Sequence, residues 1–210
     1  PCSKRTKKPI FATPKNNELW AMLLEKAWAK VNGGYIFTVA GAAAEVIECL
    51  TNFPYEYNRI DKVDEEILWK KIEVASGNDY VMTSSIASSN STDIGLIDGH
   101  MYTLEEGKEV IYKGEKIRLL KLRNPWGEVL FSGDWSENST LWNDELKVLF
   151  NYKETYDDEG EFFISYEDFR KYFSNVDICQ IKDRVCLKQS IIPYTSSCKP
   201  VLYEIFLQND

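Results

Sequence analysis

The sequence predicts an α+β domain in which helices come first and antiparallel strands follow. Before about residue 79, apolar residues recur at helical spacing. After that point, short runs rich in β-forming residues alternate with polar turns. No internal repeat or low-complexity tract interrupts this order, so a chain of 210 residues is expected to build about one domain of ordinary size.

The first helix is predicted from a stripe of apolar residues at helical spacing. The stripe consists of Trp20, Leu23, Leu24, Ala27, Trp28 and Val31. Asn16 or Asn17 is expected to cap its start, and Gly33-Gly34 to end it. We therefore expect an amphipathic helix with one buried face.

Two more helices are predicted before about residue 79, where β-rich runs begin. One covers Ala42–Leu50. The other follows Asp61 and is expected to bury Ile67, Leu68 and Ile72 along one stripe.

Short β-rich runs mark the second part of the chain. The predicted strands are Tyr80–Ile86, Tyr102–Leu104, Val110–Tyr112, Lys116–Leu122, Glu161–Ile164 and, near the end, Val201–Leu207. The second and third of these are expected to form a hairpin around residues 105–109, and the Ser-rich stretch 84–93 a mobile loop. Ser165 should cap a short helix that runs through Phe173.

The charge balance argues against nucleic acid as a partner. The chain carries 25 basic and 33 acidic residues, a net charge of −8, and this would repel a phosphate backbone. No apolar run approaches the ~18–20 residues of a membrane helix, so no transmembrane segment is expected. The start is not a signal peptide and lacks a Met, so the sequence is expected to be a piece of a longer protein.

The five cysteines form no C-x-x-C pair and accompany a single histidine, which excludes a Cys2His2 zinc site. Reduced thiols in an intracellular protein are the simplest interpretation, and they favour a cytoplasmic location.

His100 is a candidate catalytic residue because of its surroundings. Gly95 and Gly99 precede it, and the strand predicted from Tyr102 follows it. A side chain at the end of a strand is held on a rigid element, as catalytic groups require. A lone histidine is nevertheless more often structural, so the position alone does not decide its role.

Asn124 is the second candidate, at the end of a predicted strand. Pro125 favours an extended backbone at Asn124, and Gly127 permits a sharp turn. An Asn amide oxygen can accept the N–H of a His ring and set its tautomer, which leaves the other ring nitrogen free to take a thiol proton. Trp126 could shield that hydrogen bond from water. A structural turn capped by Asn124 is the alternative, and chemistry alone leaves both open.

Four segments resemble the calpain family of cysteine proteases, in the order that the family has them. They are Glu18–Lys30, Gly95–Tyr102 around the histidine, Arg123–Val129 with Gly133–Ser136 around the asparagine, and Glu159–Phe169. The asparagine motif is the most specific of them, and with their surroundings the four matches span roughly residues 14–180. The chain is thus identified as similar to the C-terminal half of a calpain protease core.

The resemblance implies a papain-like fold in which His100 is the general base, Asn124 its orienter and Trp126 a shield beside the cleft. It also places the nucleophilic Cys in a segment upstream of the Trp20 helix, outside this chain. Cys2 lacks the surroundings of the family's nucleophile and is not expected to replace it.

The resemblance further implies a calcium site between two acidic loops. Its ligands would be the side chains of Glu137, Glu159 and Glu161 and the carbonyl of Asp157. Leu130 stands where the family commonly has a carboxylate, which weakens the expected site. A solvated acidic loop is the alternative.

The expected organisation has three parts. Residues 1–34 would end the first protease subdomain, residues 35–185 would form the β-rich second subdomain, and residues 186–210 would be a linker or the start of a β domain. The function expected is that of a calcium-regulated intracellular endopeptidase acting on protein substrates, completed by the missing first subdomain. A non-catalytic calpain homologue acting as a regulatory or interaction module is the alternative.

Overall fold

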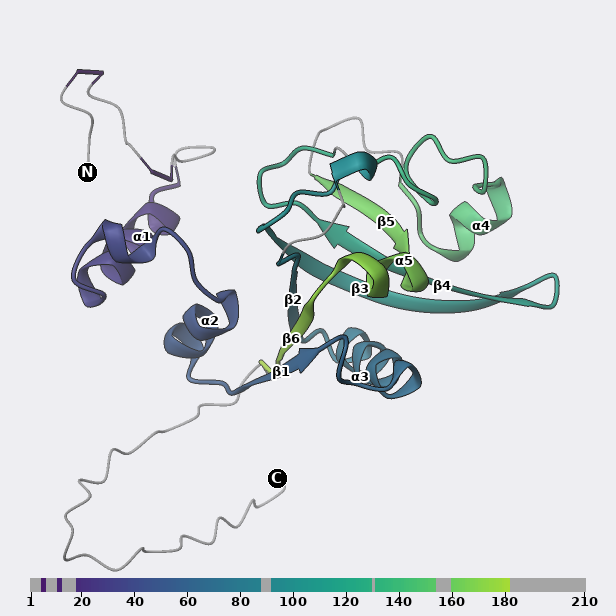
Figure 1. Cartoon of the computed structure of the whole chain (residues 1–210), viewed down its shortest axis with the longest axis horizontal. Coiled ribbons are helices and arrows are strands. Elements are labelled where there is room, and N and C mark those ends of the chain that lie inside the picture. Colours follow the sequence, from purple (N-terminus) through teal and green to yellow (C-terminus); the bar gives the residue numbers. More distant parts are fainter. Residues whose placement is uncertain are drawn as a thin grey trace, which may run out of the picture.

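An antiparallel sheet of six strands is the centre of the structure, a computed structural model that describes residues 5–6, 11–12, 18–87, 92–129, 131–153 and 160–181 (Figure 1). The strands lie in the order β1-β6-β2-β3-β4-β5. They are β1 (Tyr55–Arg59), β2 (Val81–Ser85), β3 (Met101–Tyr112), β4 (Glu115–Arg123), β5 (Glu161–Ser165) and β6 (Asn175–Cys179). With helices before and around this sheet, the α+β prediction is confirmed.

The helices lie before the sheet strands and between them. They are α1 (Trp20–Val31), η1 (Tyr35–Thr38), α2 (Ala43–Thr51), α3 (Glu65–Gly77), η2 (Thr92–Ile94), α4 (Asp144–Leu149) and α5 (Tyr166–Tyr172). Asp64 caps α3 by accepting hydrogen bonds from the amides of Glu66 and Ile67. Ser165 caps α5, as predicted, by accepting from the Asp168 amide. None of the described helices is long and apolar enough to cross a membrane.

Two hydrophobic clusters lie on the sheet. The larger combines α3 and α5 with the strands, through Leu68 and Ile72 of α3, Phe169 of α5 and Leu120 and Leu122 of β4. The smaller lies under α4, where Leu119 and Phe163 of the sheet meet Leu146 and Phe150. Because β4 alternates between the two clusters, it is buried on both faces.

The hairpin is longer than the sequence predicted. β3 is one continuous strand, and the turn to β4 lies at Lys113-Gly114, where both residues have positive φ (51° and 87°). The predicted turn at 105–109 is wrong: a β-bulge between Leu104 and Glu106 replaces it. Gly107 is needed there for packing, because a Cβ at this position would lie 2.5 Å from the Ile72 side chain of α3.

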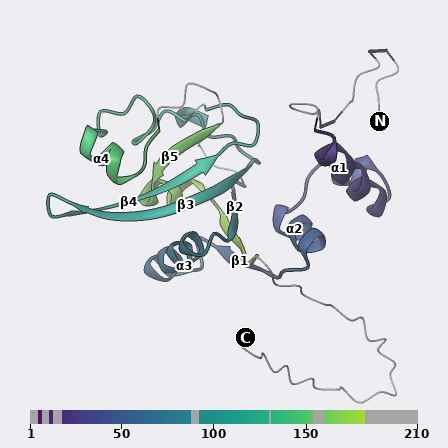
Figure 2. The same cartoon turned by 180° about the vertical axis from the view of Figure 1, so that it is seen from behind.

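The apolar stripe of α1 is not buried as predicted. The helix forms and ends before Gly33, but Trp20, Leu23 and Val31 are 62%, 63% and 77% exposed. Views from front and back show α1 apart from the sheet, where it packs mainly against η1 (Figures 1 and 2). Amphipathic spacing identifies the apolar side of a helix, but a covering surface must come from elsewhere in the fold.

Other differences concern single elements. Ile67, expected to be buried, is 56% exposed, whereas Leu68 and Ile72 are buried as predicted. β1, β6 and α4 were not predicted, and β6 lies between β1 and β2. Ser84 and Ser85, assigned to the Ser-rich loop, end β2. The predicted cap of α1 at Asn16 or Asn17 is wrong, because the helix begins at Trp20 with Leu19 at its N-cap position. The predicted strand Val201–Leu207 lies outside the described residues.

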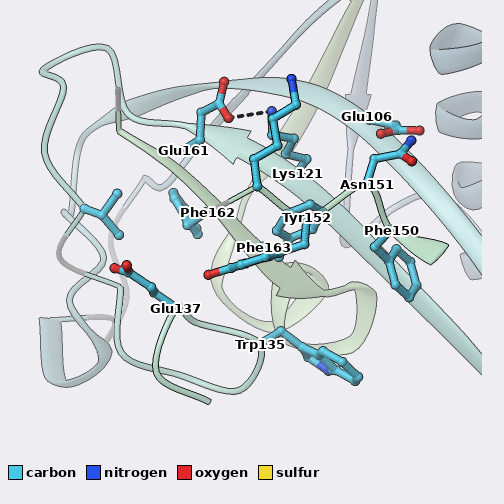
Figure 3. A pocket seen from close by; sticks show the side chains of 12 residues that line it. Glu106, Lys121, Trp135, Glu137, Phe150, Asn151, Tyr152, Glu161, Phe162 and Phe163 are labelled. Atoms are coloured by element: carbon cyan, nitrogen blue, oxygen red, sulfur yellow. Dashed lines mark ion pairs between the residues drawn. The ribbon is translucent and has the colours of Figure 1, made fainter. Parts of the chain in front are cut away.

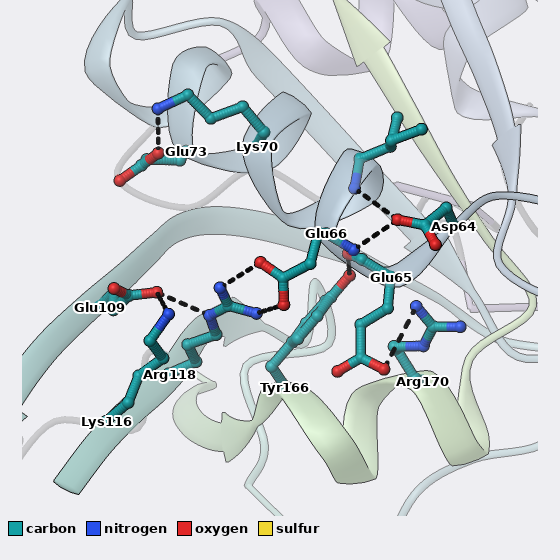
Figure 4. Close-up of polar contacts among 11 residues, drawn as sticks. Asp64, Glu65, Glu66, Lys70, Glu73, Glu109, Lys116, Arg118, Tyr166 and Arg170 are labelled. Atoms are coloured by element: carbon teal, nitrogen blue, oxygen red, sulfur yellow. Dashed lines mark hydrogen bonds and ion pairs between the residues drawn. The ribbon is translucent and has the colours of Figure 1, made fainter.

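Arg118 joins α3 to the strands β3 and β4 (Figure 4). Its guanidinium donates to both carboxylate oxygens of Glu66, at 2.7 and 2.6 Å, and to Glu109 at 2.7 Å. It also lies over the Trp69 ring, 4.9 Å from the centroid. These hydrogen bonds hold the pKa values of Glu66 and Glu109 below their usual range.

Substituting Gly107 should loosen the contact between α3 and β3. We expect Gly107→Ala to lower the free energy of unfolding by about 1–3 kcal/mol, since the added methyl group overpacks the core. Urea denaturation measures it. Gly77→Ala is the matched control: nothing lies within 4 Å of its added Cβ, so the change should be neutral or slightly stabilising. Equal losses in both variants would contradict the packing role of Gly107.

Acid should weaken the Arg118 network. The pKa values of Glu66 and Glu109 are lowered in the folded protein. Their contribution to the free energy of unfolding is therefore fully present above about pH 4.3, the pKa of an unfolded glutamate. It is lost as the pH falls through the folded pKa values. We expect the free energy of unfolding to fall more steeply between about pH 5 and pH 3 in the wild type than in Arg118→Met. Urea titrations at each pH measure the slopes. Lys30→Met, an exposed cation of α1, should keep the wild-type slope.

Candidate active site

The pairing of β3 with β4 brings His100 and Asn124 together. His100 immediately precedes β3 and Asn124 immediately follows β4, and Thr103 pairs with Arg123 between the two strands. The His100 Nε2 atom lies 2.8 Å from the Asn124 Oδ1 atom. On its other side, the His100 carbonyl accepts a hydrogen bond from the Ile86 amide at the end of β2. The histidine is thus fixed between two neighbouring strand ends.

The Asn124 amide has a defined orientation. Its side chain is buried, and its Nδ2 donates to the Glu128 carbonyl at 2.9 Å. Its Oδ1 accepts from the Trp126 amide at 3.0 Å. An amide nitrogen donates and an amide oxygen accepts, so these two contacts determine which atom faces the histidine. Oδ1 faces it, and this requires the proton of a neutral ring to be on Nε2.

Gly160 allows the loop after Asn124 to approach the start of β5. The backbone N–H of Asn124 donates to the Gly160 carbonyl at 2.8 Å. A Cβ on Gly160 would lie 2.4 Å from the Asn124 carbonyl oxygen, and its φ of +78° also favours glycine. Gly127, at φ 77°, closes the turn by donating to that same carbonyl at 3.0 Å. Backbone geometry therefore supports the position of the buried amide.

Two aromatic side chains contact the histidine ring. The Trp126 ring is 4.3 Å from it between centroids, at an angle of 46°. Trp126 is itself 65% exposed, so it covers one side of the ring without sealing it from water. Tyr102 meets the ring edge-on at 4.9 Å, and its hydroxyl accepts a hydrogen bond from the Ile97 amide. Burial raises the pKa of Tyr102, which keeps the phenol protonated.

Tyr102 was not singled out from the sequence as a site residue. Strand alternation places it on the core side of β3, where it also packs against Phe162 and Phe173. The sequence signal that could have identified Tyr102 was its spacing of two residues from His100, which places both side chains on the same face of the strand. In the structure the two rings make an edge contact.

The arrangement provides a histidine prepared to accept a proton through Nδ1. Among the described residues, Nδ1 has no hydrogen-bond partner. Neither described thiol is a hydrogen-bond partner of Nδ1. Cys49 is exposed on α2. Burial raises the pKa of the Cys179 thiol to about 11, so this thiol is protonated at neutral pH. Cys2 lies outside the described residues.

A cavity of about 250 Å³ lies between the sheet and the segment around α4 (Figure 3). Glu137 and Glu161, two of the expected calcium ligands, both line it, together with Glu106. Asp157 and Glu159, the other two, lie outside the described residues, as does Leu130. The structure thus brings half of the expected ligand set to one cavity.

The described carboxylates do not form a calcium site as they are arranged. No group of three or more His, Cys, Asp or Glu residues in the described part of the chain could hold a metal ion. Glu161 instead forms an ion pair with Lys121, 2.6 Å between Oε2 and Nζ. Burial would lower the pKa of Lys121, but its hydrogen bonds to Glu161 and Glu105 outweigh this and raise it. The ammonium is therefore charged at neutral pH.

Comparisons with known proteins show the family of this chain. The profile described as "Calpain family cysteine protease" matches residues 1–180. Calpain-9 of Rattus norvegicus is 36% identical over 173 residues, which cover 79% of this chain and 25% of that protein. Calpain-9 of Homo sapiens is 37% identical over 175 residues, with the same coverage. The calpain-1 catalytic subunit of Rattus norvegicus is 34% identical over 178 residues, covering 79% and 24%.

The chain belongs to the calpain family of cysteine proteases. This confirms the resemblance that the histidine and asparagine motifs suggested, and with it the papain-like α+β class. The chain spans about a quarter of the length of the curated relatives that it matches.

The tautomer of His100 can be tested directly, because it is the only histidine. We expect ¹⁵N spectra at about pH 8.5, where an ordinary imidazole is neutral, to show the proton on Nε2. Asn124→Ala removes the acceptor and should give a mixture of both tautomers. Asn138→Ala, on an exposed loop, should leave the spectrum unchanged. A wild-type ring protonated mainly on Nδ1 would contradict the assigned orientation of Asn124.

Proposed function

We propose that this chain supplies the general base and the orienting amide of a calpain-type thiol endopeptidase. The observation that carries the proposal is the 2.8 Å contact between His100 Nε2 and Asn124 Oδ1, with the amide orientation fixed by Trp126 and Glu128. A hydrogen bond on Nε2 leaves the lone pair of Nδ1 as the base. This is the arrangement that deprotonation of a cysteine thiol requires.

The proposed reaction is hydrolysis of a peptide bond through an acyl-enzyme. The thiol gives its proton to His100 Nδ1, and the thiolate attacks the carbonyl carbon. His100 then protonates the leaving amine, after which it takes a proton from the water that releases the acid. Asn124 keeps the ring in one orientation throughout, and Trp126 shields part of it. The substrates are proteins.

The nucleophile is proposed to lie in a first subdomain, in a segment that precedes Trp20. Residues 1–34 would end that subdomain, residues 35–185 would form the second one, and residues 186–210 would lead onward. The exposed apolar stripe of α1 supports this division, because a helix with Trp20, Leu23 and Val31 in water needs a covering surface. A cytoplasmic location, with reduced thiols, is part of the same proposal.

Calcium regulation, through Glu137, Glu159, Glu161 and the Asp157 carbonyl, is a proposal from the family resemblance. The alternative role, a non-catalytic regulatory or interaction module, would not require an oriented imidazole. A buried asparagine whose oxygen is directed at the sole histidine favours the catalytic role.

Activity of a protein that joins this chain to its first subdomain tests the proposal. By analogy with serine-protease triads, His100→Ala should reduce kcat/KM by a factor on the order of 10⁶ and Asn124→Ala by at most about 10⁴. The loss is smaller in Asn124→Ala because a misaligned ring remains a base. Cleavage of casein or a fluorogenic peptide measures both, and Asn138→Ala is the control.

Full activity of either variant would contradict the catalytic role proposed for the substituted residue. The 210-residue chain alone should not cleave these substrates, with or without calcium, because it lacks the nucleophile. Turnover that disappears on Cys2→Ser would instead make Cys2 the nucleophile.

A further inference from the structure

Two aromatic side chains contact the imidazole of His100, but only one of them is itself buried. Trp126 is 65% exposed, whereas Tyr102 is 2% exposed. The rings of Phe162 and Phe173 meet the Tyr102 ring edge-on, at 5.8 and 5.5 Å between centroids. Interlocked rings in a close-packed core restrict a side chain to one rotamer. Tyr102 is therefore the contact of the imidazole that the core holds in place, at 4.9 Å and an interplanar angle of 81°.

The hydroxyl of Tyr102 makes a second contact, with the turn that precedes His100. It accepts a hydrogen bond from the Ile97 amide at 3.0 Å. The two residues are five positions apart in the chain, so this hydrogen bond closes a loop that contains His100. One buried side chain thus holds both the imidazole and the turn that leads to it.

The same turn is held at its two ends by neighbouring elements. The Gly99 amide donates to the Ile86 carbonyl, directly after β2, at 2.8 Å. The Ser132 amide, in the loop that follows β4, donates to the Ile94 carbonyl at 2.9 Å. Between these two points, the Tyr102 hydroxyl fixes the middle of the turn. The position of His100 therefore depends on β2, on the loop after β4 and on Tyr102.

We propose that Tyr102 is a positioning residue for His100, which acts on the imidazole through its ring and on the preceding turn through its hydroxyl. Asn124 gives the imidazole one hydrogen bond, and a single hydrogen bond leaves a ring free to tilt. The Tyr102 ring removes this freedom, because it occupies the space into which the imidazole would turn. This role needs no nucleophile, and only its consequence for peptide hydrolysis rests on the function proposed above.

Substitutions of Tyr102 in the 210-residue chain separate the two contacts. Tyr102→Phe keeps the ring and removes the hydroxyl, whereas Tyr102→Leu and the longer Tyr102→Met remove both. Because His100 is the only histidine, the Nε2–H proton of its neutral ring can be followed in ¹⁵N spectra without overlap. We expect its exchange with water to be about tenfold or more faster in Tyr102→Leu and Tyr102→Met, where the imidazole can turn away from Asn124, and nearly unchanged in Tyr102→Phe.

The role of the hydroxyl is measured at Ile97. In Tyr102→Phe the Ile97 amide loses its acceptor, and its hydrogen exchange should be about two- to tenfold faster, as the loss of one hydrogen bond predicts. Tyr112→Phe is the matched control, because it removes a hydroxyl that donates to Glu145 at the other end of β3. It should change neither the Ile97 amide nor the His100 proton.

Phe169→Leu is the control for a general loss of core packing. Phe169 is fully buried in the same hydrophobic cluster, and its described ring contact is with Phe173 rather than with His100. The substitution should lower the melting temperature and leave the exchange of the His100 proton at the wild-type rate.

Kinetics of the protein joined to its first subdomain give a second measurement. Tyr102→Leu should lower kcat about tenfold or more and change KM less than about threefold, because the imidazole takes part in the reaction and not in substrate binding. Full activity of His100→Ala in the same protein would refute the proposed function. The exchange rates in the 210-residue chain would still decide the role of Tyr102.

Three results would overturn the positioning role. An unchanged His100 proton in Tyr102→Leu or Tyr102→Met would show that the ring does not hold the imidazole, and so would an equal increase of the exchange rate in Phe169→Leu. An unchanged Ile97 amide in Tyr102→Phe would remove the role of the hydroxyl. Loss of folding in both Tyr102→Leu and Tyr102→Met would show that the ring serves the core alone.

Discussion

The antiparallel pairing of β3 with β4 is the constraint on which the candidate active site depends. The chain leaves β3 at Tyr112, turns at Lys113-Gly114 and returns along β4, so the residue before β3 and the residue after β4 become neighbours. His100 and Asn124 occupy those two positions. A change of register by one residue would direct Asn124 away from the histidine, because side chains alternate between faces. The two hydrophobic clusters bury β4 on both faces and make such a change costly.

The bulge at Glu105 lies in the same strand pair and positions residues of the acidic cavity. It interrupts the ladder once, between the active-site end and the turn, and places Glu105 against Lys121. Lys121 is three residues before Asn124 on β4 and also holds Glu161, the first residue of β5. The residue before Glu161 is Gly160, whose carbonyl accepts from the Asn124 amide. The strands β4 and β5 therefore connect the acidic cavity to the His100–Asn124 pair.

The exposed face of α1 has a different cause. The helix has the composition of a buried element, yet Trp20, Leu23 and Val31 are exposed because no described part of the chain covers them. α3 shows the contrast: the same kind of spacing leads Leu68 and Ile72 into the core, where β3 offers Gly107 as the point of close approach. Whether an amphipathic helix is buried thus depends on its partner surface more than on its pattern.

By itself, the sequence determined the elements whose signals are local. Helical spacing located α1, α2 and α3, the Ser165 cap located α5, and the histidine and asparagine motifs identified the family and both candidate residues. Only the tertiary structure decided which residues meet across the sheet. The Glu105–Gly107 segment has the composition of a turn, but its long-range pairing with β4 makes it a bulge. The central strand β6 has no strong local signal, because its neighbours β1 and β2 lie far away in sequence. The partnership of Lys121 with Glu105 and Glu161 likewise joins three strands, and no spacing along one segment encodes such contacts.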